Sequence, residues 1–178
     1  MIHIHATQKL LATSRIDSVM LVTEQTADQQ MHNWYATLIS SGYQGKTFVL
    51  YFHEPSMLMV ITKGRTIATT YPSFRERLKK LLLRLEFPAD FIEREILLTE
   101  THVTGKTSNR SMLSVINQSM YMIDWKFRMF EAYDLIDSDE IEDLQMGLMF
   151  SIRGKGYTTP HDFWQNALGC KLHKRPKF

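Results

Sequence analysis

The sequence predicts a single α+β domain in which an antiparallel β-sheet meander is covered by helices, one of them long and central. The chain has 178 residues and is 44% hydrophobic, so it can bury a core of its own. Segments rich in aromatic and β-branched residues follow one another between residues 33 and 62, whereas helical periodicity dominates after residue 73. Strands followed by helices are typical of α+β proteins.

The chain is expected to open with a strand and a short helix. Isoleucine and histidine alternate over residues 2–5, as in a half-buried strand, and we expect His3 and His5 on the wetter face of an edge strand. Thr7 offers an N-cap for a helix that reaches Leu11. Residues 17–30 show no pattern and are expected to form a loop.

Three strands are predicted next, over residues 33–40, 47–53 and 57–62, separated by the turn segments "SGYQG" and "EPS". Both alternating faces of 47–53 are apolar, so this strand should be covered on both sides. A further short strand is expected over residues 67–70.

A helix is predicted from Ser73, because Ser73 and Glu76 have capping-box spacing and apolar residues recur at helical steps as far as Leu85. Residues 63–84 include seven basic residues against Glu76 alone. A solvated basic face explains this pattern, and phosphate binding is the alternative.

Further helices are expected over residues 89–98, after Pro88, and from Ser108 or Asn109 to about Phe130. The apolar stripe of the second of these predicts the central core helix. A strand should precede it at "THVTGKT".

Two more helices are expected near the C-terminus. Asp137 and Glu140 again have capping-box spacing, and the acidic residues around them suit a helix start better than a calcium loop. Thr159, Pro160 and Gly169 frame the last helix as cap, first residue and stop.

Residues 1–170 are interpreted as the domain and residues 171–178 as a basic tail. Four of the last eight residues are Lys or Arg, and without them 17 basic residues face 19 acidic ones. Any nucleic-acid binding is therefore expected to be weak, non-specific and electrostatic.

Several functional classes are not supported by the sequence. The N-terminus lacks the pattern of a signal peptide, and no long apolar run predicts a membrane span, so we expect a soluble, cytoplasmic protein. Cys170 is the single cysteine. No catalytic residue, metal site or cofactor is predicted, and the oligomeric state is left open.

The segment "TGKTSNRS" (residues 104–111) is the candidate site. Its Gly-Lys-Thr is reminiscent of a nucleotide-binding loop, but Glu100 stands where such a loop needs glycine. Lys106, Thr107, Asn109 and Arg110 nevertheless place two cations and an amide at a strand-to-helix turn, where free N–H groups favour an anion. The structural alternative is that Asn109 caps the helix and Arg110 pairs with a carboxylate.

Four segments give the chain a family resemblance: "HATQKLL", "WYATL" at Trp34–Leu38, "KTSNRS" at Lys106–Ser111 and "GYTTP" at Gly156–Pro160. In this order they are similar to motifs of an uncharacterised bacterial family, domain-of-unknown-function family 6933. Gln8 departs from the lysine that the family favours. Tyr35 and Thr37 replace a histidine and an asparagine.

The resemblance implies a small accessory protein of bacteria, often encoded on mobile DNA, without an established activity. Together with the candidate turn, it leads us to expect a non-enzymatic binding or protein-interaction module, whose partner is a protein or an anionic ligand. The alternative is a small enzyme acting on a phosphorylated or nucleic-acid substrate.

Overall fold

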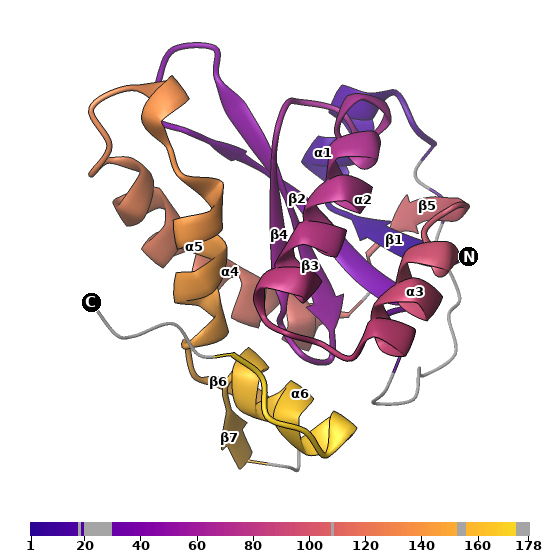
Figure 1. Ribbon diagram of the computed structural model, residues 1–178. Coiled ribbons are helices and arrows are strands. Elements are labelled where there is room, and N and C mark those ends of the chain that lie inside the picture. Colours follow the sequence, from indigo (N-terminus) through magenta and orange to yellow (C-terminus); the bar gives the residue numbers. More distant parts are fainter. Residues whose placement is uncertain (18, 20–29, 108, 153–155, 174–178) are drawn as a thin grey trace.

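The computed structural model describes residues 1–17, 19, 30–107, 109–152 and 156–173 (Figure 1). The described elements are, in chain order, β1 (Ile2–Ala6), α1 (Gln8–Ser14), β2 (Asn33–Ser40), β3 (Thr47–Glu54), β4 (Met59–Lys63), α2 (Ile67–Arg84), α3 (Ala89–Leu98), β5 (His102–Lys106), α4 (Arg110–Phe127), a 3-10 turn (Tyr133–Leu135), α5 (Ser138–Met146), β6 (Phe150–Ile152), β7 (Gly156–Thr158) and α6 (Pro160–Leu168). The fold is α+β, as expected. Among the described residues, every helix is too short or too polar to span a bilayer.

The main sheet of the described chain has the strand order β4-β3-β2-β1-β5. β2, β3 and β4 form the expected antiparallel meander. β1, however, runs parallel to both of its neighbours, β2 and β5, so the sheet is mixed. β1 is thus an inner strand, and the prediction that His3 and His5 lie on an edge strand was wrong. A parallel pair needs a long crossover, which the alternation of residues 2–5 does not reveal.

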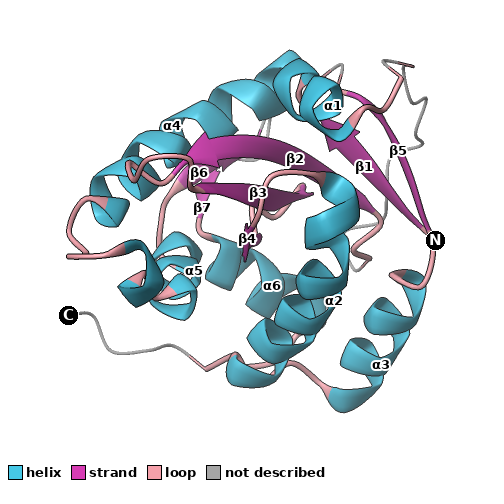
Figure 2. Ribbon diagram, turned by 90° about the horizontal axis from the view of Figure 1, so that it is seen from above, coloured by secondary structure: helices cyan, strands magenta, loops and turns pink. Residues whose placement is uncertain are grey.

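Helices cover both faces of the sheet (Figure 2). α2 and α3 lie on one face, where Trp34 and Tyr51 pack around Phe74 of α2. α4 lies on the other face, where Phe48 of β3 stacks on Phe127 with a ring distance of 4.7 Å. β3 is buried on both faces, as predicted for residues 47–53.

The start of α2 differs from the prediction. The helix begins after Thr66, whose side chain accepts a hydrogen bond from the N–H of Thr69, while the Thr69 hydroxyl reaches back toward the N–H of Thr66. Residues 67–70, expected as a strand, are therefore its first turn, and Ser73 lies inside the helix. Thr66 and Thr69 form the reciprocal cap that the sequence suggested for Ser73 and Glu76. Pro72 is accommodated within the helix.

The later helices begin where their caps predict. Asp137 accepts from two backbone N–H groups of α5, Thr159 accepts from the N–H of Asp162, and Gly169 ends α6 with a φ of 64°. The strands β6 and β7, three residues each, were not predicted.

Part of the expected basic tail packs on the domain. Leu172 is buried, and the N–H of His173 donates to the carbonyl of Leu85 at 2.9 Å. Residues 174–178 lie outside the described part of the chain. A truncation that leaves the core intact should therefore begin at Lys174.

An ion-pair network joins α2 to α5. The buried Glu142 of α5 accepts from Arg77 and Arg84 of α2, with N–O distances of 2.9 and 3.1 Å. Its Oε1 also accepts the backbone N–H of Ile61 at 2.9 Å. Ile61 belongs to the edge strand β4, so one carboxylate both satisfies a backbone N–H of this sheet edge and holds α5 against it. Two arginines of the basic α2 face are thus paired rather than solvated.

Candidate functional site

The candidate turn lies where the chain leaves the sheet after β5 and enters α4. β1 and β5 are parallel neighbours, and the helices that follow them diverge. α1 places Leu10 and Leu11 in the core beneath α2, whereas α4 places Met112 in the core on the opposite face. In open sheets with parallel strands, such a switch point creates the crevice in which ligands bind.

Asn109 is the N-cap of α4, and both the oxygen and the nitrogen of its side-chain amide form hydrogen bonds. Its Oδ1 accepts the N–H of Met112 at 3.1 Å, and its Nδ2 donates to Oε1 of Glu54 at 2.9 Å. Glu54 is the last residue of β3, so this side chain links the start of α4 to the sheet. The capping role considered from the sequence is therefore present.

Tyr35 of β2 completes this polar cluster. Burial and the charge of the nearby Glu54 carboxylate raise the pKa of Tyr35 above its usual value, so its phenol stays protonated beside Glu54 and Asn109. The ring of His5 stacks on Tyr35 with a centroid distance of 4.8 Å. Burial lowers the pKa of His5, which keeps the imidazole neutral at pH 7.

Two hydroxyl groups lie at the ends of the parallel strands. Thr7 follows β1 and Thr107 follows β5, and the N–H of Thr107 donates to the carbonyl of Ala6 at 3.2 Å. The Oγ1 atoms of both threonines are buried and have no hydrogen-bond partner among the described residues. Thr7 was expected to cap α1, but its side chain makes no such bond.

The two cations of the turn are exposed. Lys106 ends β5 and pairs in register with Ala6, whose side chain faces α2, so Lys106 extends from that face of the sheet. Arg110 is the first residue of α4. Within the described chain neither side chain forms an ion pair, and the carboxylate partner considered for Arg110 is not among these residues. The four predicted residues thus follow one another along the backbone of the turn, and Asn109 is hydrogen-bonded to the first turn of α4.

The backbone of "TGKT" does not wrap around an empty centre as a nucleotide loop does. Thr104, Gly105 and Lys106 belong to β5, and the N–H groups of Lys106 and Thr107 donate to the carbonyls of Val19 and Ala6. These donors are therefore not available for phosphate.

Sequence reasoning missed Glu54, Tyr35 and His5 as neighbours of the turn. They lie on three different strands, and only the sheet register brings them together, with His5 opposite Tyr35 and Asn33 opposite Glu54. No short motif marks this arrangement. Groups of three or more potential metal-ligating side chains are not found among the described residues.

Asn109→Ala should destabilise the fold by about 1–3 kcal/mol, because it removes both the cap of α4 and the donor to Glu54. Asn109→Asp keeps the cap acceptor, removes the donor and adds a carboxylate beside Glu54, so it separates the two contributions. Denaturant unfolding measures both variants. Ser111→Ala, at an exposed position of the same helical turn, is the matched control. A loss below about 0.5 kcal/mol for Asn109→Ala would show that the two hydrogen bonds of Asn109 do not stabilise the fold.

Comparison with known proteins identifies the family to which the sequence is similar. A family model described as "Domain of unknown function (DUF6933)" matches residues 3–163, which include most of β1, all of β2 and the β5–α4 turn. No curated protein matches the chain.

Proposed function

The chain belongs to the family described as domain of unknown function 6933, and from the geometry at the β5–α4 turn we propose that it is a non-enzymatic binding or protein-interaction protein that holds an anionic group there. The observation that carries this proposal is the exposure of Lys106 and Arg110, which have no ion-pair partner among the described residues. The family resemblance supports a bacterial accessory protein encoded on mobile DNA, and the sequence pattern of the N-terminus supports the proposal that it works in the cytoplasm.

The position of the turn supports an anionic rather than a neutral group. The N-terminus of α4, an 18-residue helix, carries the partial positive charge of the helix dipole. Arg110 offers a planar fork of donors that fits carboxylate and phosphate groups. The hydroxyl of Thr107 is an additional donor, since its Oγ1 has no acceptor among the described residues.

The neighbouring polar cluster supports binding rather than catalysis. Asn109 donates to Glu54 beside Tyr35, and this bond fixes the start of α4. The role of this bond is then to hold the turn in one conformation, so that less entropy is lost when a ligand binds.

The alternative function is a small enzyme that acts on a phosphorylated or nucleic-acid substrate. Glu54 favours it, because this half-buried carboxylate lies beside the turn and near Tyr35, on which the ring of His5 stacks. Hydrolysis of p-nitrophenyl phosphate or of a single-stranded oligonucleotide that is lost in Glu54→Gln, at unchanged stability, would favour the enzyme.

For nucleic acid we propose weak and non-specific binding through the basic C-terminal residues. A chain ending at His173 would keep the contacts of Leu172 and His173 with the domain. Its binding to DNA at low salt, compared with that of the full chain, measures the contribution of the residues beyond.

Titration with inorganic phosphate, followed by amide chemical shifts, tests the anion site. We expect the largest shifts at residues 107–111, and the double variant Lys106→Ala/Arg110→Ala should lower the affinity at least about tenfold. The matched control is Lys79→Ala/Lys80→Ala, which removes two exposed cations from α2. Unchanged affinity in the first variant, or an equal loss in the control, would contradict the proposal.

A further inference from the structure

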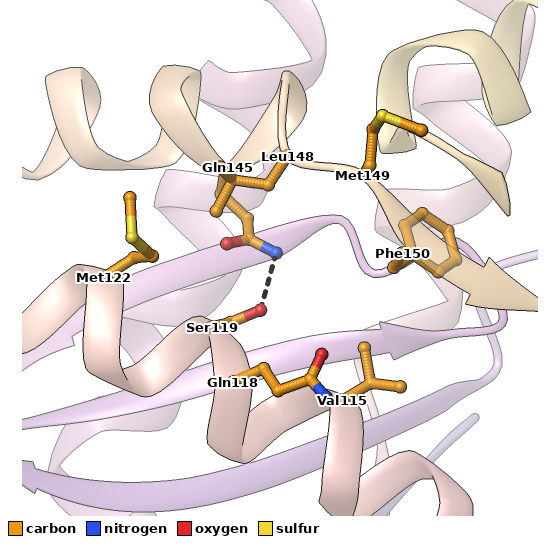
Figure 3. A pocket seen from close by; sticks show the side chains of 8 residues that line it. All are labelled: Val115, Gln118, Ser119, Met122, Gln145, Leu148, Met149 and Phe150. Carbon is orange, nitrogen blue, oxygen red and sulfur yellow. Dashed lines mark hydrogen bonds between the residues drawn. The ribbon is translucent and has the colours of Figure 1, made fainter.

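A second surface, away from the β5–α4 turn, has the features of a binding site. A shallow cavity of about 130 Å³ lies between α4 and the segment that joins α5 to β6 (Figure 3). Its lining is mostly apolar and includes Met122 of α4 and Met149 before β6. Met149 is 70% exposed, and methionine side chains adapt readily to the shape of a neighbour.

The cavity contains a polar group without a complete set of partners. Gln145 is only 2% exposed, and its Nε2 donates to Oγ of Ser119 at 3.3 Å (Figure 3) and also to the carbonyl of Met57 at 3.4 Å. Its Oε1 is buried and has no donor among the described residues. A buried acceptor without a donor is costly, so the group that fills this cavity should combine an apolar body with one N–H or O–H donor.

The outer face of α4 carries a stripe of exposed side chains that runs past this cavity and becomes apolar after Gln118. Gln118, Met122 and Trp125 follow one another at steps of four and three residues, and Met129 lies in the turn that directly follows the helix. This is the spacing of a helix that packs along another helix, and it lies beside the stripe that α4 already uses against the sheet. Met122, Trp125 and Met129 are nevertheless 40%, 53% and 57% exposed. Contiguous apolar exposure of this kind marks an interaction surface.

The chain itself carries the group that the cavity requires. Trp125 is exposed, whereas the other two tryptophans, Trp34 and Trp164, are fully buried. Its indole is a large apolar body with a single N–H donor, and that donor has no acceptor in the described part of the chain. Tryptophan is also the side chain most often found as an anchor at interfaces.

We propose that the chain forms a two-fold symmetric dimer in which the α4 helices pack antiparallel. Trp125 of each copy fills the cavity of the other copy and donates its indole N–H to Oε1 of Gln145. If the two-fold axis passes between residues 121 and 122, Trp125 lies level with Gln118 of the second copy, which lines the cavity. The contact is isologous and closes at two copies. This inference is independent of the anion site at the β5–α4 turn.

Sedimentation velocity over a range of protein concentrations tests the dimer. The mass should rise from 20.9 kDa toward twice that value. Trp125→Ala should weaken the dimer at least about 30-fold, as expected for an interface anchor, and Trp125→Phe, which keeps an apolar ring without the donor, about tenfold. Leu83→Ala, on α2 and 55% exposed, is the matched control and should leave the dimer unchanged.

Fluorescence provides a second readout. Because Trp34 and Trp164 are buried, quenching by acrylamide reports mainly on Trp125, and it should decrease as the protein concentration rises. Since Trp125 is exposed, both of its variants should keep the thermal unfolding of the wild-type monomer. A mass that stays at one chain at every concentration would overturn the proposal, with water or another protein as the occupant of the cavity. A dimer that Trp125→Ala leaves intact would overturn it equally.

Discussion

Glu142→Ala should destabilise the fold by about 3–5 kcal/mol, the largest effect that we expect from a polar substitution in this chain. Glu142 is 1% exposed and is the shared acceptor for Arg77, Arg84 and the N–H of Ile61. Its removal leaves two partly buried cations with fewer partners and an edge-strand N–H without an acceptor. Denaturant unfolding at pH 7 measures the loss.

Asp139→Ala is the matched control within the same network. Asp139 also binds both arginines, but its side chain is 41% exposed, so water replaces it and the loss should stay below about 1 kcal/mol. Equal losses in the two variants would show that α2 and α5 are held together by general charge attraction rather than by the buried carboxylate.

The pH dependence of the same residue has a definite sign. Burial raises the pKa of Glu142 from 4.5 to about 6, although both arginines and the N–H of Ile61 oppose the shift. Between these values the folded chain binds more protons than the unfolded chain, so the wild type loses stability as the pH rises through this window. Relative to Glu142→Gln, which does not titrate, the loss should be about 2 kcal/mol. Urea unfolding of both proteins at pH 4 and pH 7 tests the sign, and a relative gain by the wild type at pH 7 would contradict it.

Features that depend on neighbouring residues were predicted from the sequence. The caps Asn109, Asp137 and Thr159 mark the starts of α4, α5 and α6, because each acts on N–H groups two or three residues ahead. The β2–β4 meander was predicted for the same reason, since its short turns join strands that are adjacent in the sequence. The predicted start of α2 was wrong although a helix start is a local feature, because Thr66 and Ser73 offer two competing caps.

Features that depend on pairing between distant segments were not predicted. The parallel register of β1 with β2 and β5 decides that His5 is buried beside Tyr35, and no local pattern encodes a parallel register. The Glu54–Asn109 bond spans 55 residues and is missed for the same reason.

The α2–α5 network could have been suspected from charge alone. Seven basic residues between positions 63 and 84 and an acidic segment after Asp134 were each interpreted as solvated or capping groups. The structure pairs them, with Arg84 bonded to both Glu142 and Asp143. Opposite charge excesses on two amphipathic helices of one small domain favour mutual packing, although the partners Arg77 and Arg84 could not be singled out.

Ile116→Ala should cost about 2–5 kcal/mol, because Ile116 lies on the inward stripe of α4 and is 2% exposed. It belongs to the core between α4 and the sheet that also holds Phe48 and Phe127. Truncation removes apolar area from that core and leaves a cavity that the flanking β-strands cannot close without breaking their ladder. Ile116→Val, which removes a single methylene, should cost about 0.5–1.5 kcal/mol.

Leu97→Ala is the matched control for Ile116, because Leu97 is a helical apolar residue of α3 that is 63% exposed, and it should change stability by less than about 0.5 kcal/mol. Denaturant unfolding of the three variants tests more than one side chain. α4 has a buried apolar stripe that includes Ile116 and an exposed stripe that includes Trp125. Both contain apolar side chains, so only their position around the helix distinguishes them. A cost for Ile116→Ala as small as that for Leu97→Ala would mean that α4 is not packed on the sheet through the inward stripe. In that case the exposure of Trp125 would no longer define an outer face.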